Sequence, residues 1–266
     1  MQSARRKKYL KALEIETWVS RDAPPESLAV AEPMPVVEKA QQKVIPVAPP
    51  MATSVVAAAP QVRKTTVAPN PAAAIKVPED WAGVRALVKD CRACRLCETR
   101  TQTVFGVGPE SAPLMVVGEG PGADEDARGE PFVGRAGQLL DQMLRAIGRS
   151  RRTDTYIANV VKCRPPNNRE PAEDEAEACR AYLETQLKLV KPKLILALGR
   201  VAAQRLLMTD AALSKIRGQM HSWGPDATPL MVTYHPAYLL RSPGEKAKSW
   251  QDLKKAHQFL QATGGA

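Results

Sequence analysis

The feature that most constrains this chain is an alternation of short apolar runs with longer segments of helical periodicity after residue 113. The apolar runs predict buried strands at 114–117, 155–161, 194–198 and 230–234. The longer segments predict helices at 136–147, 172–190, 201–207 and 247–260. Because strand–helix alternation favours a mainly parallel sheet covered on both faces, the sequence predicts a three-layer α/β/α fold.

The N-terminal part has a different composition. Residues 22–80 hold 11 of the 23 prolines and no aromatic residue, so they cannot bury enough surface to offset the entropy of ordering. We therefore expect a disordered N-terminal extension, with a short amphipathic helix in 1–20, a linker over 21–80 and a folded domain over 81–266. Within the first segment, 5–19 is read either as a solvated, half-formed helix or as a docking peptide for a protein partner.

Charge and cysteine content limit the environment of the chain. The formal net charge is +10, of which residues 1–82 contribute +3 and the remainder +7. This positive charge either favours binding to a polyanion such as DNA or serves only solubility. The sequence shows neither an apolar membrane span nor a secretory signal. Five cysteines without such a signal indicate a reducing compartment. We expect a cytoplasmic bacterial protein, associated with the nucleoid and monomeric, that does not contact membranes.

Two polar loops follow predicted strands. The first is GEGPG at 118–122, continuing to GRAG at 134–137, and the second is HPAYLLR at 235–241. Loops at the carboxyl ends of strands in one α/β sheet meet at a single crevice, where such folds bind their ligands. The sequence therefore predicts one site built from both loops.

Cysteines form a second constellation. Cys91 and Cys94 are a C-x-x-C pair, Cys163 follows a predicted strand, and Cys179 lies in a predicted helix. Four thiolates from two separated places bind zinc or an iron–sulfur cluster, and unliganded thiols are the third alternative. The wide spacing of the second pair favours a cluster over zinc. Cys97 is a further candidate beside the first pair.

Taken together, the motifs resemble those of the family 4 uracil-DNA glycosylases, the bacterial and archaeal iron–sulfur type. The resemblance spans about 91–260. It is carried by C-x-x-C at 91–94, GEGPG at 118–122, PFVGRAG at 131–137, NVVKCRPPNNR at 159–169, ALG at 197–199 and HPAYLLR at 235–241. It implies a monofunctional DNA N-glycosylase that removes uracil and so starts base excision repair of deaminated cytosine.

The resemblance also implies a cofactor. Its ligands would be Cys91, Cys94, Cys163 and Cys179, which hold a structural [4Fe-4S] cluster, whereas Cys97 is not a ligand. A related branch bonds covalently to its uracil site through a histidine in an inserted basic loop. This chain has no insertion after Gly137, so we expect ordinary turnover without an adduct.

Uracil release needs a group that stabilises the departing anion, because catalysis binds the transition state better than the substrate. His235 is expected to hydrogen-bond uracil O2, Asn159 to pair with N3–H and O4, and Phe132 to stack on the flipped base. The competing interpretations are a loop histidine with satisfied hydrogen bonds, an asparagine that caps its own backbone, and a core phenylalanine.

The glycine-rich loop supplies the remaining pocket residues. We expect Gly118, Gly120 and Gly122 to let backbone approach the base and sugar closely. By resemblance, Glu119 shapes the pocket floor and Glu125 fills the space of a thymine methyl group. Either carboxylate could hold the water nucleophile, and the acidic run 124–126 is otherwise a solvated turn.

DNA contacts are expected from the second loop and from basic residues near the cysteines. Leu239 or Leu240 is expected to wedge into the duplex, as intercalating leucines do elsewhere. The candidate phosphate contacts are Arg241, Arg164, Arg169 and Lys162. The substrate is expected to be uracil-containing DNA, single- or double-stranded.

Three other functions remain open at this stage. The chain could be a non-catalytic iron–sulfur or zinc protein that only binds nucleic acid, for example as a polymerase accessory. It could be an electron-transfer protein, although we expect a structural cluster that does not readily change its oxidation state. It could also be a broader glycosylase that removes deaminated purines as well.

Overall fold

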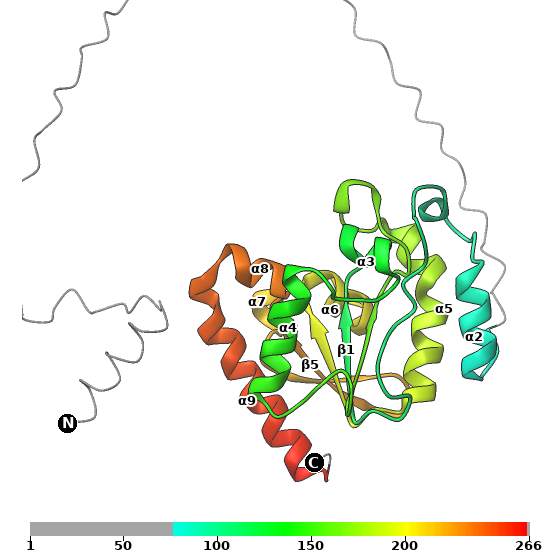
Figure 1. Ribbon diagram of the computed structural model, residues 1–266. Helices are drawn as coiled ribbons and strands as arrows, with labels where there is room; N and C mark the ends of the chain where they lie inside the picture. The colour runs from blue at the N-terminus through cyan, green and yellow to red at the C-terminus, as the bar shows by residue number, and fades with distance from the viewer. Residues whose placement is uncertain (1–76, 265–266) are drawn as a thin grey trace, which may run out of the picture. The chain divides into compact units, whose positions relative to one another are not determined.

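The computed structural model describes residues 77–264 (Figure 1). The predicted N-terminal helix and nearly all of the predicted linker lie outside the described residues. Within 77–264, no helix has the length and apolar character needed to cross a membrane. The first described helix, α2, begins at Trp81 and is capped by Asp80, whose side chain accepts a hydrogen bond from the Gly83 N–H.

A five-stranded sheet with the order β2-β1-β3-β5-β4 forms the centre of this part of the chain. Its strands are β1 (Leu114–Gly118), β2 (Thr155–Asn159), β3 (Leu194–Leu198), β4 (Met220–Trp223) and β5 (Thr228–Thr233). The first four in spatial order are parallel, and only β4 pairs antiparallel, with β5. The predicted mainly parallel sheet is confirmed.

Helices cover both faces of the sheet (Figure 1). The helices are α2 (Trp81–Lys89), α3 (Ala123–Arg128), α4 (Arg135–Ala146), α5 (Glu173–Val190), α6 (Gly199–Leu207), α7 (Leu213–Ile216), α8 (Pro236–Arg241) and α9 (Lys246–Ala262). Short 3-10 turns lie at Arg95–Glu98, Pro166–Asn168 and Pro243–Glu245. Apolar residues of α2, α5 and α6 pack on one face of the sheet, and those of α4, α8 and α9 pack on the other. The predicted three-layer α/β/α architecture is confirmed.

The buried strands explain the apolar runs of the sequence. Every residue of β1, β2 and β3 is buried, because helices shield both faces of a parallel sheet. Successive side chains alternate between the two layers: Met115 and Val117 join the α5 side, whereas Leu114 and Val116 join the α4 side.

Some predicted boundaries differ from the structure. The strand predicted over 155–161 ends at Asn159, although the Val160 and Val161 N–H groups still donate to the carbonyls of Gly118 and Glu119. The acidic run 124–126 is not a solvated turn: it lies in α3, where Asp126 is buried and accepts hydrogen bonds from the Thr101 N–H. The carboxyl ends of β1, β2, β3 and β5 lie at one edge of the sheet, and the loops that follow them build the site.

Candidate active site

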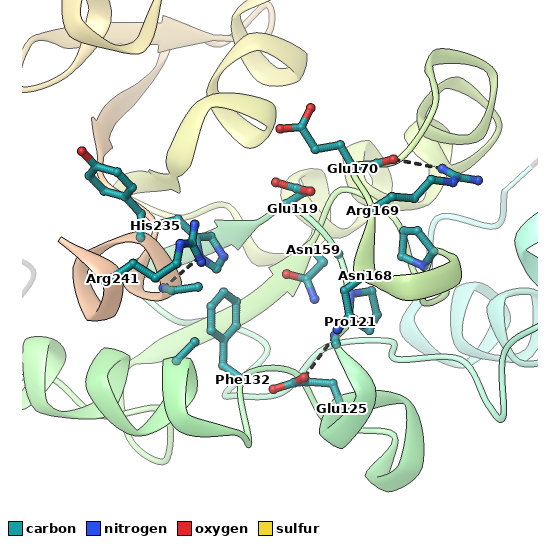
Figure 2. A pocket seen from close by; sticks show the side chains of 16 residues that line it. Glu119, Pro121, Glu125, Phe132, Asn159, Asn168, Arg169, Glu170, His235 and Arg241 are labelled. Atoms are coloured by element: carbon teal, nitrogen blue, oxygen red, sulfur yellow. Dashed lines mark hydrogen bonds between the residues drawn. The ribbon is translucent and has the colours of Figure 1, made fainter. Parts of the chain in front are cut away.

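A cavity of about 450 Å³ lies at the carboxyl edge of the sheet. It is lined by Glu119, Gly120, Pro121, Gly122, Glu125, Phe132, Ala136, Asn159, Pro165, Asn168, Arg169, Glu170, His235, Ala237, Tyr238 and Arg241. The two loops that the sequence placed at one crevice therefore meet there, with side chains from both directed toward the same space (Figure 2). A volume of this size is typical of small-ligand sites.

His235 is the N-cap residue of α8, and its ring bonds to the first turn of that helix. Its Nδ1 accepts a hydrogen bond of 3.2 Å from the Ala237 N–H, so the proton of the neutral ring is placed on Nε2. Burial, with a smaller contribution from Arg241, lowers the pKa of His235 to about 4. The ring is therefore neutral near pH 7 and presents an N–H donor rather than a full positive charge.

Asn159 ends β2 inside the cavity, with only 1% of its surface exposed. Its side-chain Oδ1 and Nδ2 are both buried and have no hydrogen-bond partner within residues 77–264. The backbone carbonyl is held, because Lys162 Nζ donates to it at 2.9 Å. Gly118 lies against the amide, and a Cβ there would collide with Asn159 Oδ1 and the Phe132 ring. The amide therefore packs closely against Gly118 and is unpaired among the described residues.

Phe132 forms one wall of the cavity, from the turn between α3 and α4. Its backbone adopts a φ of +55°, an unusual conformation for a residue with a bulky side chain. The ring centroid lies 5.6 Å from that of His235, at an interplanar angle of 33°. Both rings and Asn159 line the same cavity.

The two predicted carboxylates have different surroundings. Glu125 accepts hydrogen bonds from the N–H groups of Gly122, Val133 and Gly134, so it joins the two halves of the glycine-rich loop. Burial and the nearby carboxylate of Glu170 raise the pKa of Glu119 to about 7, against the opposing effect of Arg200. With this pKa, Glu119 changes charge near neutral pH.

The expected DNA contacts divide into residues at the cavity and residues elsewhere. Arg241 and Arg169 line the cavity, although Arg169 also pairs with Glu175 at 2.6 Å. Arg164 lies outside the lining and donates to Asn168 Oδ1 at 2.7 Å. Leu240 is 36% exposed on α8.

Two expectations require correction. Leu239 is 1% exposed and packs in the core beneath α8, so it is unsuited to wedging into a duplex. Lys162 is also 1% exposed, and its ammonium donates to Asn159 O and Gln186 Oε1 at 2.9 and 2.6 Å, so it cannot contact phosphate. Burial lowers the pKa of this lysine to about 8.

Several cavity residues were missed by sequence reasoning. These are Pro121, Ala136, Pro165, Asn168, Glu170, Ala237 and Tyr238. Most lie inside the motifs already singled out, so position within a motif was the available signal. Glu170 gave no signal, because an exposed glutamate beside an arginine is ordinary on a protein surface.

The cysteines gather at a second, smaller cavity. It is lined by Cys91, Ala93, Cys94, Cys97, Arg100, Lys162, Cys163, Ala178, Cys179 and Tyr182. Arg100 Nη1 donates to Cys163 Sγ at 3.0 Å, and the Lys162 backbone N–H donates to Cys179 Sγ at 3.4 Å. Such donors stabilise thiolates, which is the form that binds metal.

The ionisation of these thiols is unfavourable without a positive ligand. Burial raises the pKa of Cys94 to about 11 and that of Cys179 to about 12. Within residues 77–264, no three His, Cys, Asp or Glu side chains form the close group expected around a single metal ion. The convergence of sulfur atoms and thiolate-stabilising donors nevertheless fits a thiolate-bound group at this cavity.

Comparisons with known proteins show which family the chain is similar to. The family model described as "Uracil DNA glycosylase superfamily" matches residues 105–254. A "Type-4 uracil-DNA glycosylase" of Archaeoglobus fulgidus is 45% identical over 175 residues, which are 63% of this chain and 87% of the relative. One of Thermotoga maritima is 43% identical, over 66% of this chain and 93% of the relative. A "Type-5 uracil-DNA glycosylase" of Thermus thermophilus is 28% identical, over 56% and 85%.

Proposed function

The chain belongs to the uracil DNA glycosylase superfamily, and from this premise we propose that it hydrolyses the N-glycosidic bond between uracil and deoxyribose in DNA. The proposal depends above all on one observation: the buried amide of Asn159 has no partner among the described residues. A folded protein leaves such a group unpaired at a cost of about 1–3 kcal/mol, which a complementary ligand recovers.

The amide pattern selects uracil. One amide oxygen can accept from uracil N3–H, while the amide nitrogen donates to O4. Cytosine presents an acceptor at N3 and an amino donor at position 4, so its pairing with an amide fixed in this orientation fails at both points. Gly118 lies against the amide and Lys162 holds the Asn159 backbone carbonyl, so both keep the residue at this side of the cavity.

His235 is proposed to stabilise the departing base. As the bond to the sugar breaks, negative charge develops on the uracil ring, including O2. A neutral histidine with its proton on Nε2 can donate a hydrogen bond to that oxygen, and one preorganised donor of this kind is worth about 3–4 kcal/mol. Phe132 would stack on the base, which must first leave the duplex at a cost of a few kcal/mol.

The two carboxylates are proposed to have different roles. One acts at the sugar, and the other excludes a base with a methyl group. Glu119, when ionised, can hold the attacking water and stabilise positive charge on the sugar. Glu125, tied to three backbone N–H groups, would fill the space that a thymine methyl group needs. The glycines at 120 and 122 keep this part of the loop close to the substrate.

The cysteine cavity is proposed to hold a structural [4Fe-4S] cluster through Cys91, Cys94, Cys163 and Cys179. Two observations support it: the four thiols line one cavity, and Arg100 and the Lys162 N–H donate to two of the sulfur atoms. When bound, the cluster supplies cross-links between α5, the segment after α2 and the loop after β2. The chain's own residues at this cavity then keep the end of β2, and with it Asn159, in place.

DNA would lie across the mouth of the active-site cavity. Arg241, Arg169 and Arg164 are proposed phosphate contacts, and Leu240 is the exposed candidate for a wedge. The folded domain over 81–266 would carry the reaction, whereas 1–20 and 21–80 would serve as docking peptide and linker.

The direct test is release of free uracil from an oligonucleotide that contains one uracil, read as strand cleavage after alkali. Protein with its full iron content should cleave this strand but not strands with thymine or cytosine at the same position. His235→Ala should lower the rate about 100- to 1000-fold. His221→Ala is the matched control, because His221 lies outside the cavity lining and its ring bonds to the Ile216 carbonyl. Equal rates for the two variants would contradict the proposal.

A further inference from the structure

Arg151 makes an unusual set of contacts just before β2. Its Nη2 donates to the Phe132 carbonyl at 2.8 Å and its Nη1 to the Pro131 carbonyl at 2.9 Å. The same guanidinium pairs with Asp141 at 2.8 Å and with Glu130 at 3.3 Å. Only 13% of this side chain is exposed. One arginine therefore joins two consecutive backbone carbonyls to a helix on the other side of the turn.

The turn that Arg151 holds has little freedom. Phe132 has a positive φ, which costs free energy unless its surroundings enforce it. Gly137 of α4 lies directly against the Phe132 carbonyl, so that even a Cβ at 137 would collide with it. On the other side, the Phe132 ring lies against Gly118. The backbone is thus confined by α4 and by β1, with Arg151 satisfying the carbonyl that points out of the turn.

We propose that Arg151 is a positioning residue for substrate binding: it fixes the plane of the Phe132 ring against which the flipped base stacks. This inference rests on the proposed function, and it adds a residue that is not part of the cavity lining. Arg151 reaches the cavity only through the two carbonyls, so it contacts neither base nor sugar. Asp141 and Glu130 orient the guanidinium and compensate its charge.

The chemistry of the bridge requires arginine. A guanidinium presents five donors in a rigid fork and can serve two carbonyls and a carboxylate at once. A lysine at this position would keep the charge but supply a single ammonium centre, which cannot reproduce the fork. Misplacement of a reacting group by about 1 Å can lower a rate about 100-fold, so loss of the bridge should be visible in catalysis.

The test compares single-turnover uracil excision by Arg151→Met, Arg151→Lys and the matched control Arg152→Met. Arg152 is exposed, so its replacement removes the same charge from the same loop without touching the turn. We expect Arg151→Met to lower the rate about 10- to 100-fold, Arg151→Lys to lie between it and the wild type, and Arg152→Met to stay within about twofold. Melting temperature and iron content are measured for each variant.

A double-mutant cycle with Phe132→Ala separates positioning from simple loss of stability. If Arg151 acts through the Phe132 ring, Arg151→Met should change the rate less than about twofold once that ring is absent. Independent, multiplying losses would overturn the proposal, as would a normal rate for Arg151→Met in the presence of Phe132. If the wild-type protein itself releases no uracil, the proposed function fails and this role fails with it. If only this inference is wrong, the wild type still releases uracil and the rate losses of the two substitutions multiply.

Discussion

Replacing Asn159 with alanine is expected to leave the free protein at least as stable as the wild type while removing most of its activity. The side chain has two buried polar atoms without partners among the described residues. An unpaired amide of this kind costs the folded state about 1–3 kcal/mol, because it has lost its hydrogen bonds to water. Truncation at Cβ removes this penalty, which is the reverse of the usual effect of shortening a buried side chain.

The magnitude follows from two opposing terms. Relief of the unpaired amide contributes about 1–3 kcal/mol, and loss of packing around the deleted amide subtracts about 1–3 kcal/mol. The space left behind opens into the active-site cavity, so the packing loss lies at the low end of that range. We expect a net stabilisation of about 0–2 kcal/mol, or an increase in melting temperature of about 0–8 °C for a domain of this size.

The activity should change in the opposite direction. Two hydrogen bonds to uracil are lost, at about 0.5–1.5 kcal/mol each, so excision should fall about 10- to 100-fold. Denaturant unfolding and single-turnover excision on the same preparation measure both quantities. Gln186→Ala is the stability control, because Gln186 is equally buried but bonds to Lys162, Phe105 O and Tyr156. The free energy of unfolding of Gln186→Ala should be lower than that of the wild type by about 3 kcal/mol or more. An Asn159→Ala variant as destabilised as this control, or one with normal excision, would refute the reasoning.

Three further predictions concern ionisation, the cysteine cavity and the support of β2. Because burial raises the pKa of Glu119 to about 7, its carboxylate forms between about pH 6 and 8; the excision rate should rise over that interval, and Glu119→Gln should flatten the rise. Cys179→Ser should lose iron and the broad visible absorbance of the cluster, while Cys97→Ser keeps both. Lys162→Met, which leaves Asn159 O and Gln186 Oε1 without their donor, should lower the free energy of unfolding by about 2–4 kcal/mol in a denaturant titration.

The sequence predicted those strands and helices whose positions depend on the local pattern of apolar residues. The run 194–198 is apolar throughout because β3 is covered on both faces, and its predicted bounds match the observed strand. The edge strand β4 was missed, since it is short and its residues are only half-buried or exposed. The six-residue helix α8 was also missed, and without it the sequence could not show that Leu239 faces the core while Leu240 faces outward.

Side-chain partners across the fold were beyond sequence reasoning. A lysine beside a cysteine motif is most often a surface charge, and nothing local shows that Lys162 meets Gln186 from α5 inside the protein. The same holds for Arg151, whose contacts with Phe132 depend on how the α3–α4 turn packs against the loop before β2. The residues of the cavity could be chosen from motifs, but the groups that hold them in position could not.

The contrast among buried polar groups links stability to specificity. Asp252 is 2% exposed and bonds to both Thr233 and Arg217, and Lys162 bonds to two oxygens. Asn159 is as deeply buried, yet its amide bonds to nothing in the described part of the chain. A group of this kind discriminates strongly, because a ligand of the wrong pattern leaves its penalty in place whereas the right one removes it. On the proposed function, the free energy that the unpaired Asn159 amide costs the free protein would contribute to the preference for uracil over cytosine, so a variant that recovers it by removing the amide would lose that preference.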